Sequence, residues 1–294
     1  MTGLRAAVAL ALVVLWMSPA SALGPTQQVP KRIYSIGDSI TRAFDADLPY
    51  DNLHLSWVNG SHNFISALLG LPNVQSHHQR IVANFGAAGV RNRIAAQNGN
   101  DVFHFARQVD GMNGRENYVT VLLGGNDVCQ STIEELPTDE EFAGAFADGM
   151  NALVAKLQPG ATVQVVAIPD VKRLYEIALD KKALGIIDCP LLWATTSLGF
   201  PCGSMLSPEN TEADREYVRQ RNVGYNTIMH YLTNVTAWYN PHLYISFTDV
   251  TFTYPFTQDH VSNIDCYHPS ADGQAMISEG TWNAGFLAEH EELE

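Results

Sequence analysis

Short apolar runs that stop at glycine or proline, and that alternate with longer helix-like segments, constrain the fold of this chain most strongly. The run 117–123 is followed by Gly124-Gly125, and the run 162–168 by Pro169. Such continuous apolar runs are typical of strands buried on both faces. Strands that alternate with helices favour a mostly parallel sheet covered on both sides. We therefore predict an α/β chain with strands at 31–36, 79–84, 117–123, 162–168 and 242–247.

Helical periodicity supports the same class. Segment 139–157 places apolar residues on one helical face and is followed by Pro159-Gly160. Two further helices are predicted at 214–238 and 271–287. We find no repeat and no linker-like stretch, so we expect one domain over 23–294. Within it, 184–206 is apolar but broken by glycines and prolines, which indicates a compact insertion rather than a membrane span.

The amino-terminal residues 1–22 have the features of a signal peptide. Arg5 gives a positive start, 6–16 is almost wholly apolar, and Ala20-Ser21-Ala22 has the small-x-small form of a cleavage site. We expect removal after Ala22, a secreted or periplasmic protein, and no transmembrane segment after signal removal. An uncleaved anchor is the alternative, although the apolar run is short for a span.

The charge of the chain limits its partners. Its net charge is −14, and no basic stretch offsets this, so we expect no nucleic-acid binding and no electrostatic binding to anionic membranes. Histidines and cysteines show no zinc-ligand spacing, so we expect no metal and no cofactor. The oligomeric state is not readable from the sequence. Asn59 and Asn234 begin glycosylation sequons, which matter only in a eukaryote.

Four cysteines fit an oxidising compartment and can pair in three ways. Cys189 and Cys202 flank the apolar insertion, so we predict that they close it. Cys129 would then pair with Cys266 and tie two of the loops considered below together.

Two polar motifs follow predicted strands. Ser39, in Gly37-Asp38-Ser39, follows the first strand and precedes an expected helix, which would place its hydroxyl at the carboxyl edge of the sheet. Asn126 follows Gly124-Gly125, so its amide is placed to donate to an oxyanion. Taken singly, Ser39 is also read as a helix cap and Asn126 as a turn residue.

A third motif lies near the carboxyl end. Asp265 and His268 are separated by two residues in one loop, where a carboxylate can orient a histidine base. The competing candidates are Asp259-His260 and Asp249. Adjacent residues such as Asp259 and His260 tend to point apart, which favours Asp265 with His268. Together, these motifs predict a serine esterase.

The chain resembles the SGNH or GDSL hydrolase family. The blocks that resemble it are Gly37-Asp38-Ser39-Ile40, Asn84-Phe85-Gly86-Ala87-Ala88-Gly89, Gly124-Gly125-Asn126-Asp127 and Asp265-Cys266-Tyr267-His268-Pro269. They occur in family order and span nearly all of the mature chain. Asp47-Leu48-Pro49 and Leu55-Ser56-Trp57 add a likeness to its phospholipase B branch.

The resemblance implies a three-layer α/β/α sandwich with a flavodoxin-like sheet. It implies Ser39 as nucleophile, His268 as base, Asp265 as its orienter, and an oxyanion hole of Ser39, Gly89 and Asn126. We expect a carboxylic ester hydrolase acting on lipid or lysophospholipid esters. The insertion, with Trp193 and Phe200, either covers an acyl chain or is a packed surface insertion. A carbohydrate acetyl esterase and a catalytically silent binding protein on the same fold remain alternatives.

Overall fold

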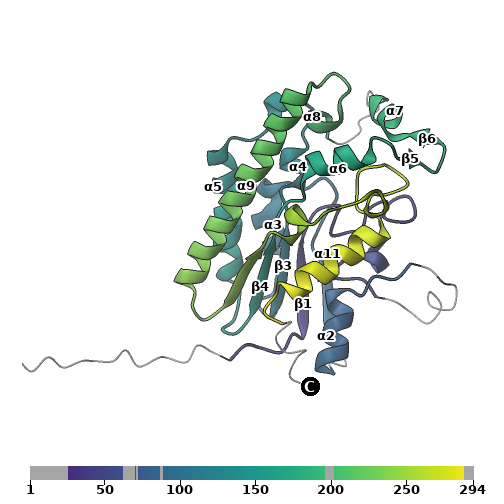
Figure 1. The fold of residues 1–294 in the computed structure, drawn as a ribbon. Coiled ribbons are helices and arrows are strands. Elements are labelled where there is room, and N and C mark those ends of the chain that lie inside the picture. Colours follow the sequence, from purple (N-terminus) through teal and green to yellow (C-terminus); the bar gives the residue numbers. More distant parts are fainter. Residues whose placement is uncertain (1–25, 62–69, 71, 87–88, 196–201, 288–294) are drawn as a thin grey trace, which may run out of the picture.

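A computed structural model describes residues 26–61, 70, 72–86, 89–195 and 202–287 of the chain. The predicted signal peptide, 1–22, lies outside them. The centre of the molecule is a five-stranded sheet in the order β2-β1-β3-β4-β7, and every neighbouring pair is parallel (Figure 1). The strands are β1 (Arg32–Gly37), β2 (Arg91–Ile94), β3 (Tyr118–Leu122), β4 (Thr162–Val166) and β7 (Tyr244–Thr248).

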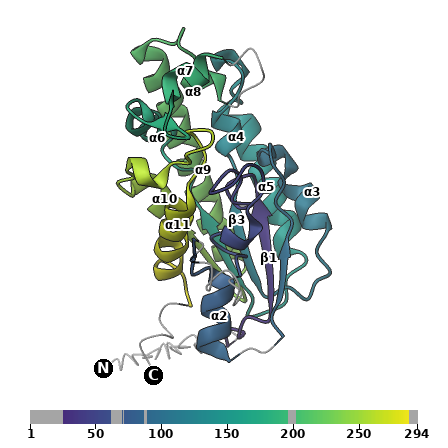
Figure 2. The ribbon, with the colours of Figure 1, turned by 90° about the vertical axis from the view of Figure 1, so that its right-hand side faces the viewer.

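Helices cover both faces of this sheet and make the expected three-layer sandwich. One layer holds α3 (Phe105–Asp110), α5 (Asp139–Val154) and α9 (Glu212–Tyr239), and the other holds α2 (His77–Phe85) and α11 (Ala271–Asn283). Turned by 90°, α11 and α2 lie to the left of strands β1 and β3, and α3 and α5 lie to their right (Figure 2). The inner strands β3 and β4 are buried at every position, as their continuous apolar sequences predict.

Shorter elements carry the loops at the carboxyl edge of the sheet and the insertion. They are η1 (Leu53–Leu55), η2 (Val102–His104), α4 (Gly125–Val128), η3 (Ile133–Glu135), α6 (Val171–Ala178), β5 (Lys182–Ala183), β6 (Ile187–Asp188), α7 (Cys189–Ala194), α8 (Gly203–Leu206), α10 (Val250–Thr253) and η5 (Gln258–His260). None of the helices in the described part of the chain is long and apolar enough to cross a membrane.

One predicted strand is wrong. Segment 79–84 belongs to helix α2, and the second strand is β2, about ten residues later. A capping box explains the helix, because the Ser76 side chain accepts from the Gln79 N–H while the Gln79 side chain accepts from the Ser76 N–H. β2 is an edge strand whose residues are largely exposed, so it lacks the apolar signal of the buried strands. The other four strands and three long helices lie where the pattern predicts them, within a few residues.

The predicted disulfide pairing is also wrong. The structure pairs Cys129 with Cys202 and Cys189 with Cys266. Helix α8 docks on the residues at both sides of Cys129, where the Ser204 hydroxyl donates to the Val128 carbonyl oxygen at 2.8 Å and the Ser204 N–H donates to the Gln130 carbonyl oxygen at 2.9 Å, and this carries Cys202 to Cys129. The predicted approach of the two loops is nevertheless present, because the Tyr267 hydroxyl lies 2.5 Å from the Cys129 sulfur.

The insertion differs from the expected acyl cover. Trp193 is buried, with its ring 5.6 Å from that of Tyr175, so it belongs to the core. Phe200 lies outside the described residues. The sequon at Asn59 is buried and bonded within the protein, because its amide contacts both Ser35 and Asn92, whereas Asn234 is exposed on α9.

Candidate active site

Ser39 lies at the carboxyl edge of the sheet, two residues beyond the end of β1. It begins a series of turns, and the expected helix is absent there. The Asp38 carboxylate shapes the turn by accepting the Ile40 N–H at 2.9 Å. The N–H of Ser39 has no acceptor among the described residues, so the turn supplies a free donor without the help of a helix dipole.

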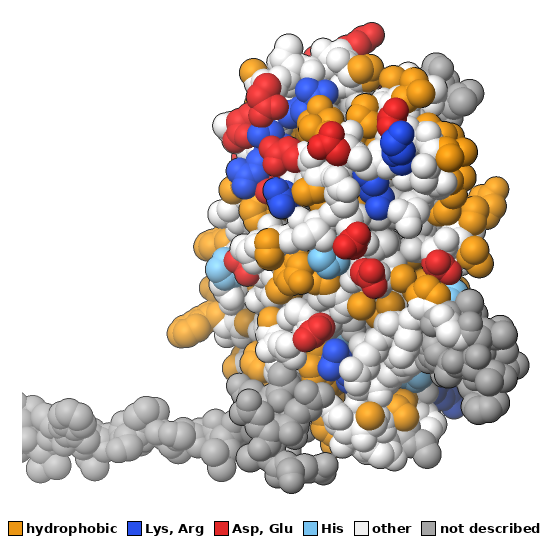
Figure 3. Space-filling view, turned by 45° about the vertical axis from the view of Figure 1, so that its right-hand side comes forward, with side chains coloured by type: hydrophobic (Ala, Val, Ile, Leu, Met, Phe, Trp, Pro, Cys, Tyr) orange, Lys and Arg blue, Asp and Glu red, His pale blue; other side chains and the backbone are white. Residues whose placement is uncertain are grey.

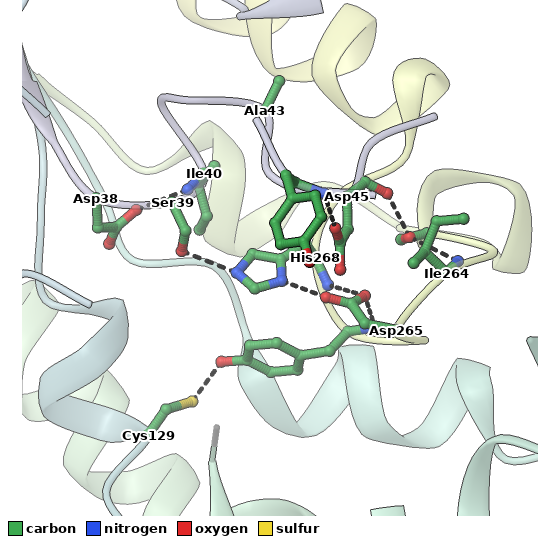
Figure 4. Close-up of polar contacts among 12 residues, drawn as sticks. Asp38, Ser39, Ile40, Ala43, Asp45, Cys129, Ile264, Asp265 and His268 are labelled. Carbon is green, nitrogen blue, oxygen red and sulfur yellow. Dashed lines mark hydrogen bonds and ion pairs between the residues drawn. The ribbon is translucent and has the colours of Figure 1, made fainter. Parts of the chain in front are cut away.

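Asp265 and His268 lie on the same short loop, and His268 is hydrogen-bonded to Ser39 on one side and to Asp265 on the other (Figure 4). His268 Nε2 lies 2.8 Å from Ser39 Oγ, and His268 Nδ1 is hydrogen-bonded to Asp265 Oδ2. The other oxygen of Asp265 accepts the backbone N–H groups of Tyr267 and His268, at 2.9 and 3.0 Å. Positive φ at Cys266 lets the loop turn tightly enough for these bonds. All three side chains are more than nine-tenths buried, so the Ser39–His268–Asp265 chain of bonds is largely shielded from water.

Burial and the Asp265 carboxylate act oppositely on His268. Burial lowers the pKa of His268, but attraction to Asp265 outweighs it, so the pKa lies above its ordinary value. For Asp265, burial raises the pKa, yet the charge and hydrogen bond of His268 outweigh burial and leave the pKa lowered. The competing histidine, His260, instead accepts the Thr257 N–H at 3.0 Å on η5.

Asn126 lies beside this group, on α4, directly after the positive-φ Gly124. One hydrogen of its side-chain amide is donated to the Asn100 carbonyl oxygen at 2.7 Å. This bond holds the amide at the loop that follows β2. The amide carries a second donor hydrogen, which remains for a bound molecule.

The structure contradicts the prediction for Gly89. β2 runs parallel to β1 with Arg91 opposite Arg32, so Gly89 lies at the amino end of β2. At about 3.3 Å per residue, this is about 15 Å or more from Ser39. The error follows from the misplaced second strand, which put Gly89 at a strand's carboxyl end.

The loop after β2 places a different glycine near Ser39. Gln97 N–H donates to the Gly37 carbonyl oxygen at 3.2 Å, so this loop lies along the end of β1. Gly99 follows, with φ of +75° and no atom within 4 Å of the position of a Cβ. Its N–H has no acceptor among the described residues. Sequence reasoning did not consider Gly99, because β2 itself was missed.

Gln108 on α3 clamps this loop to the Ser39 turn. Its side chain accepts the Gly37 N–H at 2.9 Å and donates to the Gly37 carbonyl oxygen at 2.8 Å. It also donates to Asn100 Oδ1 at 2.9 Å. Sequence analysis overlooked Gln108, although a glutamine beside Phe105 and Val109 on the buried face of a helix is a signal of a fixed polar contact.

Two buried carboxyl groups lie behind the site. Asp38 and Asp127 are each almost fully buried, and each has one oxygen without a hydrogen-bond partner among the described residues. Burial raises the pKa of Asp38 to about 7, although the Ile40 N–H lowers it. Burial likewise raises the pKa of Asp127 to about 7, although the Val102 N–H lowers it. Both groups therefore favour the protonated form in the folded state.

This predicts a pH-dependent effect of Asp127→Asn on stability. A carboxyl whose pKa is raised from 3.8 to about 7 on folding weakens the fold as pH rises through that window. Asparagine lacks this penalty. From pH 5 to pH 8, the free energy of unfolding of Asp127→Asn should rise relative to wild type by about 2–4 kcal/mol. Urea unfolding at both pH values measures it.

The exposed Asp148 on α5 gives the matched control, Asp148→Asn, whose relative stability should change by less than about 0.5 kcal/mol between the two pH values. A relative stability of Asp127→Asn that is the same at pH 5 and pH 8 would contradict the raised pKa.

A small cavity of about 20 Å³, which is room for about one water molecule, opens over Ser39 and His268. Its polar floor is formed by the site residues, and its wall is apolar, with Ile40, Pro169, Val171 and Leu174. Among the described residues, no group of three or more His, Cys, Asp or Glu side chains is placed to hold a metal ion.

Comparison with known proteins identifies the family. The family model described as GDSL-like Lipase/Acylhydrolase matches residues 33–281. The chain belongs to this family. The family match confirms the resemblance of this GDSL hydrolase that was drawn from its motifs. A comparison with curated proteins found no match.

Solved structures show a similar fold to this GDSL hydrolase. A family two carbohydrate esterase from Clostridium thermocellum, in complex with cellohexaose, has a TM-score of 0.50 and 14% identity over 91% of this chain and 66% of that one. A family 3 carbohydrate esterase from the same organism has a TM-score of 0.47 and 13% identity, over 89% and 98% of the two chains. Phospholipase A1 from Streptomyces albidoflavus NA297 has a TM-score of 0.46 and 16% identity, over 86% and 96%.

Proposed function

We propose that this GDSL hydrolase is a serine carboxylic ester hydrolase that works through an acyl-enzyme. The observation that carries the proposal is the continuous chain of hydrogen bonds from Ser39 through His268 to Asp265. A hydroxyl, a base and a buried orienter in this geometry form the working unit of a serine hydrolase.

The chemistry follows from the bonds that each group makes. Ser39 Oγ attacks the ester carbonyl carbon while His268 Nε2 takes its proton. His268 then gives that proton to the departing alcohol oxygen as the carbon–oxygen bond breaks. A water molecule, deprotonated in the same way, hydrolyses the acyl-enzyme and restores Ser39. Asp265 keeps the Nδ1 hydrogen of His268 in place and stabilises the imidazolium that forms.

The negative charge on the carbonyl oxygen needs donors at the same edge of the sheet. We assign three: the N–H groups of Ser39 and Gly99, which have no acceptor among the described residues, and the second amide hydrogen of Asn126. Gln108 is a positioning residue in this proposal, because it fixes the loops that carry Ser39 and Gly99.

The apolar cavity wall supports an acyl group as the part of the substrate that is recognised. Val171 and Leu174 of α6 and Ile40 line it, and no cation faces it among the lining residues. We therefore propose lipid or lysophospholipid esters as the substrate class. Secretion belongs to the same proposal, supported by the signal-like residues 1–22 and by two disulfides, which suit an oxidising compartment.

A series of p-nitrophenyl esters from acetate to palmitate tests the proposal. Hydrolysis by the purified protein, with kcat/KM rising with acyl length, is the expected result. Turnover of acetate alone would favour the carbohydrate acetyl esterase. The absence of turnover for every ester, in protein that is folded by circular dichroism, would favour the silent binding protein.

The pH dependence of kcat/KM should report His268. Only neutral His268 can accept the proton of Ser39, so activity rises as pH passes upward through the pKa of His268. Because that pKa is raised, the midpoint of the wild-type enzyme should lie above 6.5. In Asp265→Asn the largest raising interaction is gone, while burial still lowers the pKa of His268 and the charges of Asp38 and Asp45 still raise it, so the midpoint should fall below that of the wild type, at reduced activity.

Initial rates between pH 5 and pH 9 measure both midpoints. His260→Gln is the control, because His260 bonds Thr257 on η5, and it should leave the profile unchanged. A midpoint that is the same with and without the Asp265 carboxylate would contradict the role given to this residue.

A further inference from the structure

Five large apolar side chains are exposed near the candidate site. Leu48 and Tyr50 lie on the loop before η1, and Leu184, Ile186 and Leu191 lie on the β5–β6 hairpin and α7. Each is 60–76% exposed. We call these five residues the apolar collar. We propose that the apolar collar docks the enzyme on the surface of zwitterionic phospholipid, and this rests on the proposed lipid-ester function.

Both halves of the collar are bonded to the loop that carries the base. The Ser262 hydroxyl donates to the Asp45 carbonyl oxygen at 2.5 Å, and the Leu184 N–H donates to the Asn263 carbonyl oxygen at 2.7 Å. The Phe44 ring links the collar to the site, since it lies 5.2 Å from the His268 ring and 6.4 Å from the Tyr50 ring. A surface that held the collar would therefore lie next to His268.

Folding alone does not account for two collar residues. Tyr50 has φ of +73° and Leu184 has φ of +50°, in the left-handed region that glycine and asparagine adopt more readily. A bulky apolar side chain at such a position is normally balanced by packing. Both side chains are exposed, so they strain the backbone without adding to the core. Burial in a lipid surface would supply the missing apolar contact.

The charge around the hairpin selects the kind of lipid. The segment 170–191 holds four acidic and four basic residues, so it is neutral, whereas the whole chain carries −14. At the base of the hairpin, Lys182 and Asp188 neutralise each other in an ion pair of 3.2 Å, and the turn between them is uncharged. Hydrophobic side chains gather along the right-hand edge of the face in Figure 3, whereas charges of both signs gather at its upper left. The loop that carries Leu48 and Tyr50 is acidic, because Asp45 and Asp47 remain beside the Arg42–Asp51 ion pair. A neutral hairpin tip and an acidic loop disfavour anionic headgroups, so zwitterionic ones fit the collar better.

Sedimentation with phosphatidylcholine vesicles tests the docking without turnover of the lipid. All proteins carry Ser39→Ala, and the test variant adds Leu184→Asn and Ile186→Asn, of which the first also relieves the positive φ. Trp238→Asn is the matched control, because Trp238 is 82% exposed at the far end of α9. We expect the test variant to bind vesicles about 100-fold more weakly, and the control to bind unchanged.

Each other outcome is informative. The docking proposal would be overturned if the test variant bound vesicles as tightly as the Ser39→Ala protein, or if the Trp238→Asn control lost as much binding as the test variant. It would also be overturned if no protein bound the vesicles, or if binding required phosphatidylserine. A lipid-free dimer that the two asparagines split would instead show that a second copy covers the collar. With Ser39 intact, the two asparagines should leave the hydrolysis of dissolved p-nitrophenyl acetate within about twofold. If the wild type cannot hydrolyse that ester, the esterase proposal fails separately, because vesicle binding is measured without catalysis.

Discussion

Ser39→Ala should reduce kcat for p-nitrophenyl esters by roughly 10⁴- to 10⁶-fold, because the three residues of a serine hydrolase act as a unit. The side-chain bond that the described structure gives to Ser39 is the one to His268, so the fold should be retained. Steady-state kinetics and thermal unfolding of the same preparation measure the two effects. His268→Ala should lose nearly as much activity.

Ser131→Ala is the matched control, because Ser131 is exposed and lies outside the residues that line the cavity. Its activity should stay close to that of the wild type. A fluorophosphonate should label Ser39 in the wild type and nothing in Ser39→Ala. Labelling of another serine, or full activity in Ser39→Ala, would show that the nucleophile is assigned wrongly.

Asn126→Ala should lower kcat by about 100- to 1,000-fold and leave KM nearly unchanged, because the donor is needed most when charge builds on the carbonyl oxygen. The Asn126 amide also donates to the Asn100 carbonyl oxygen. A loss of activity through a displaced loop must therefore be distinguished from a loss of activity through the missing oxyanion donor. Gln130→Ala provides this control. Its side chain donates to the Asn126 backbone oxygen at 2.8 Å and supports the turn, without facing the cavity.

We expect less than about tenfold loss in Gln130→Ala. Similar losses in the two variants, or an increase of KM alone in Asn126→Ala, would assign Asn126 to the support of the turn.

The local parts of the site were predictable from the sequence because short motifs determine them. Ser39 and Asn126 follow strands β1 and β3, which are neighbours in a parallel sheet, so their loops must emerge at the same edge. The i,i+3 spacing of Asp265 and His268 allows one loop to bring both side chains together. The family resemblance agreed with these positions, and the structure adds their distances.

The remaining parts depend on contacts that no local pattern encodes. β2 carries Arg91, Asn92 and Arg93 on an edge strand, so no apolar alternation reveals it, and Gly89 was chosen in place of Gly99. The cysteine pairing depends on how α8 packs against residues 128–131, a contact between segments more than 70 residues apart. Gln108 is one polar residue on the buried face of α3, and its role becomes visible only when the structure places it beside Gly37.

The crossed disulfides have a consequence for the part of the chain between Cys189 and Cys202. One end of that segment is fastened beside the base and the other beside the Asn126 turn, because Cys189 is bonded to Cys266 and Cys202 to Cys129. A flap that swings open needs one free end or a hinge, and both ends here are anchored to the two sides of the cavity. The described ends of the segment, 189–195 and 202, are therefore each held by a disulfide to a loop of the candidate site. Because each disulfide fixes one end of the segment independently, a change of sequence between Cys189 and Cys202 need not displace the loops of His268 and Asn126.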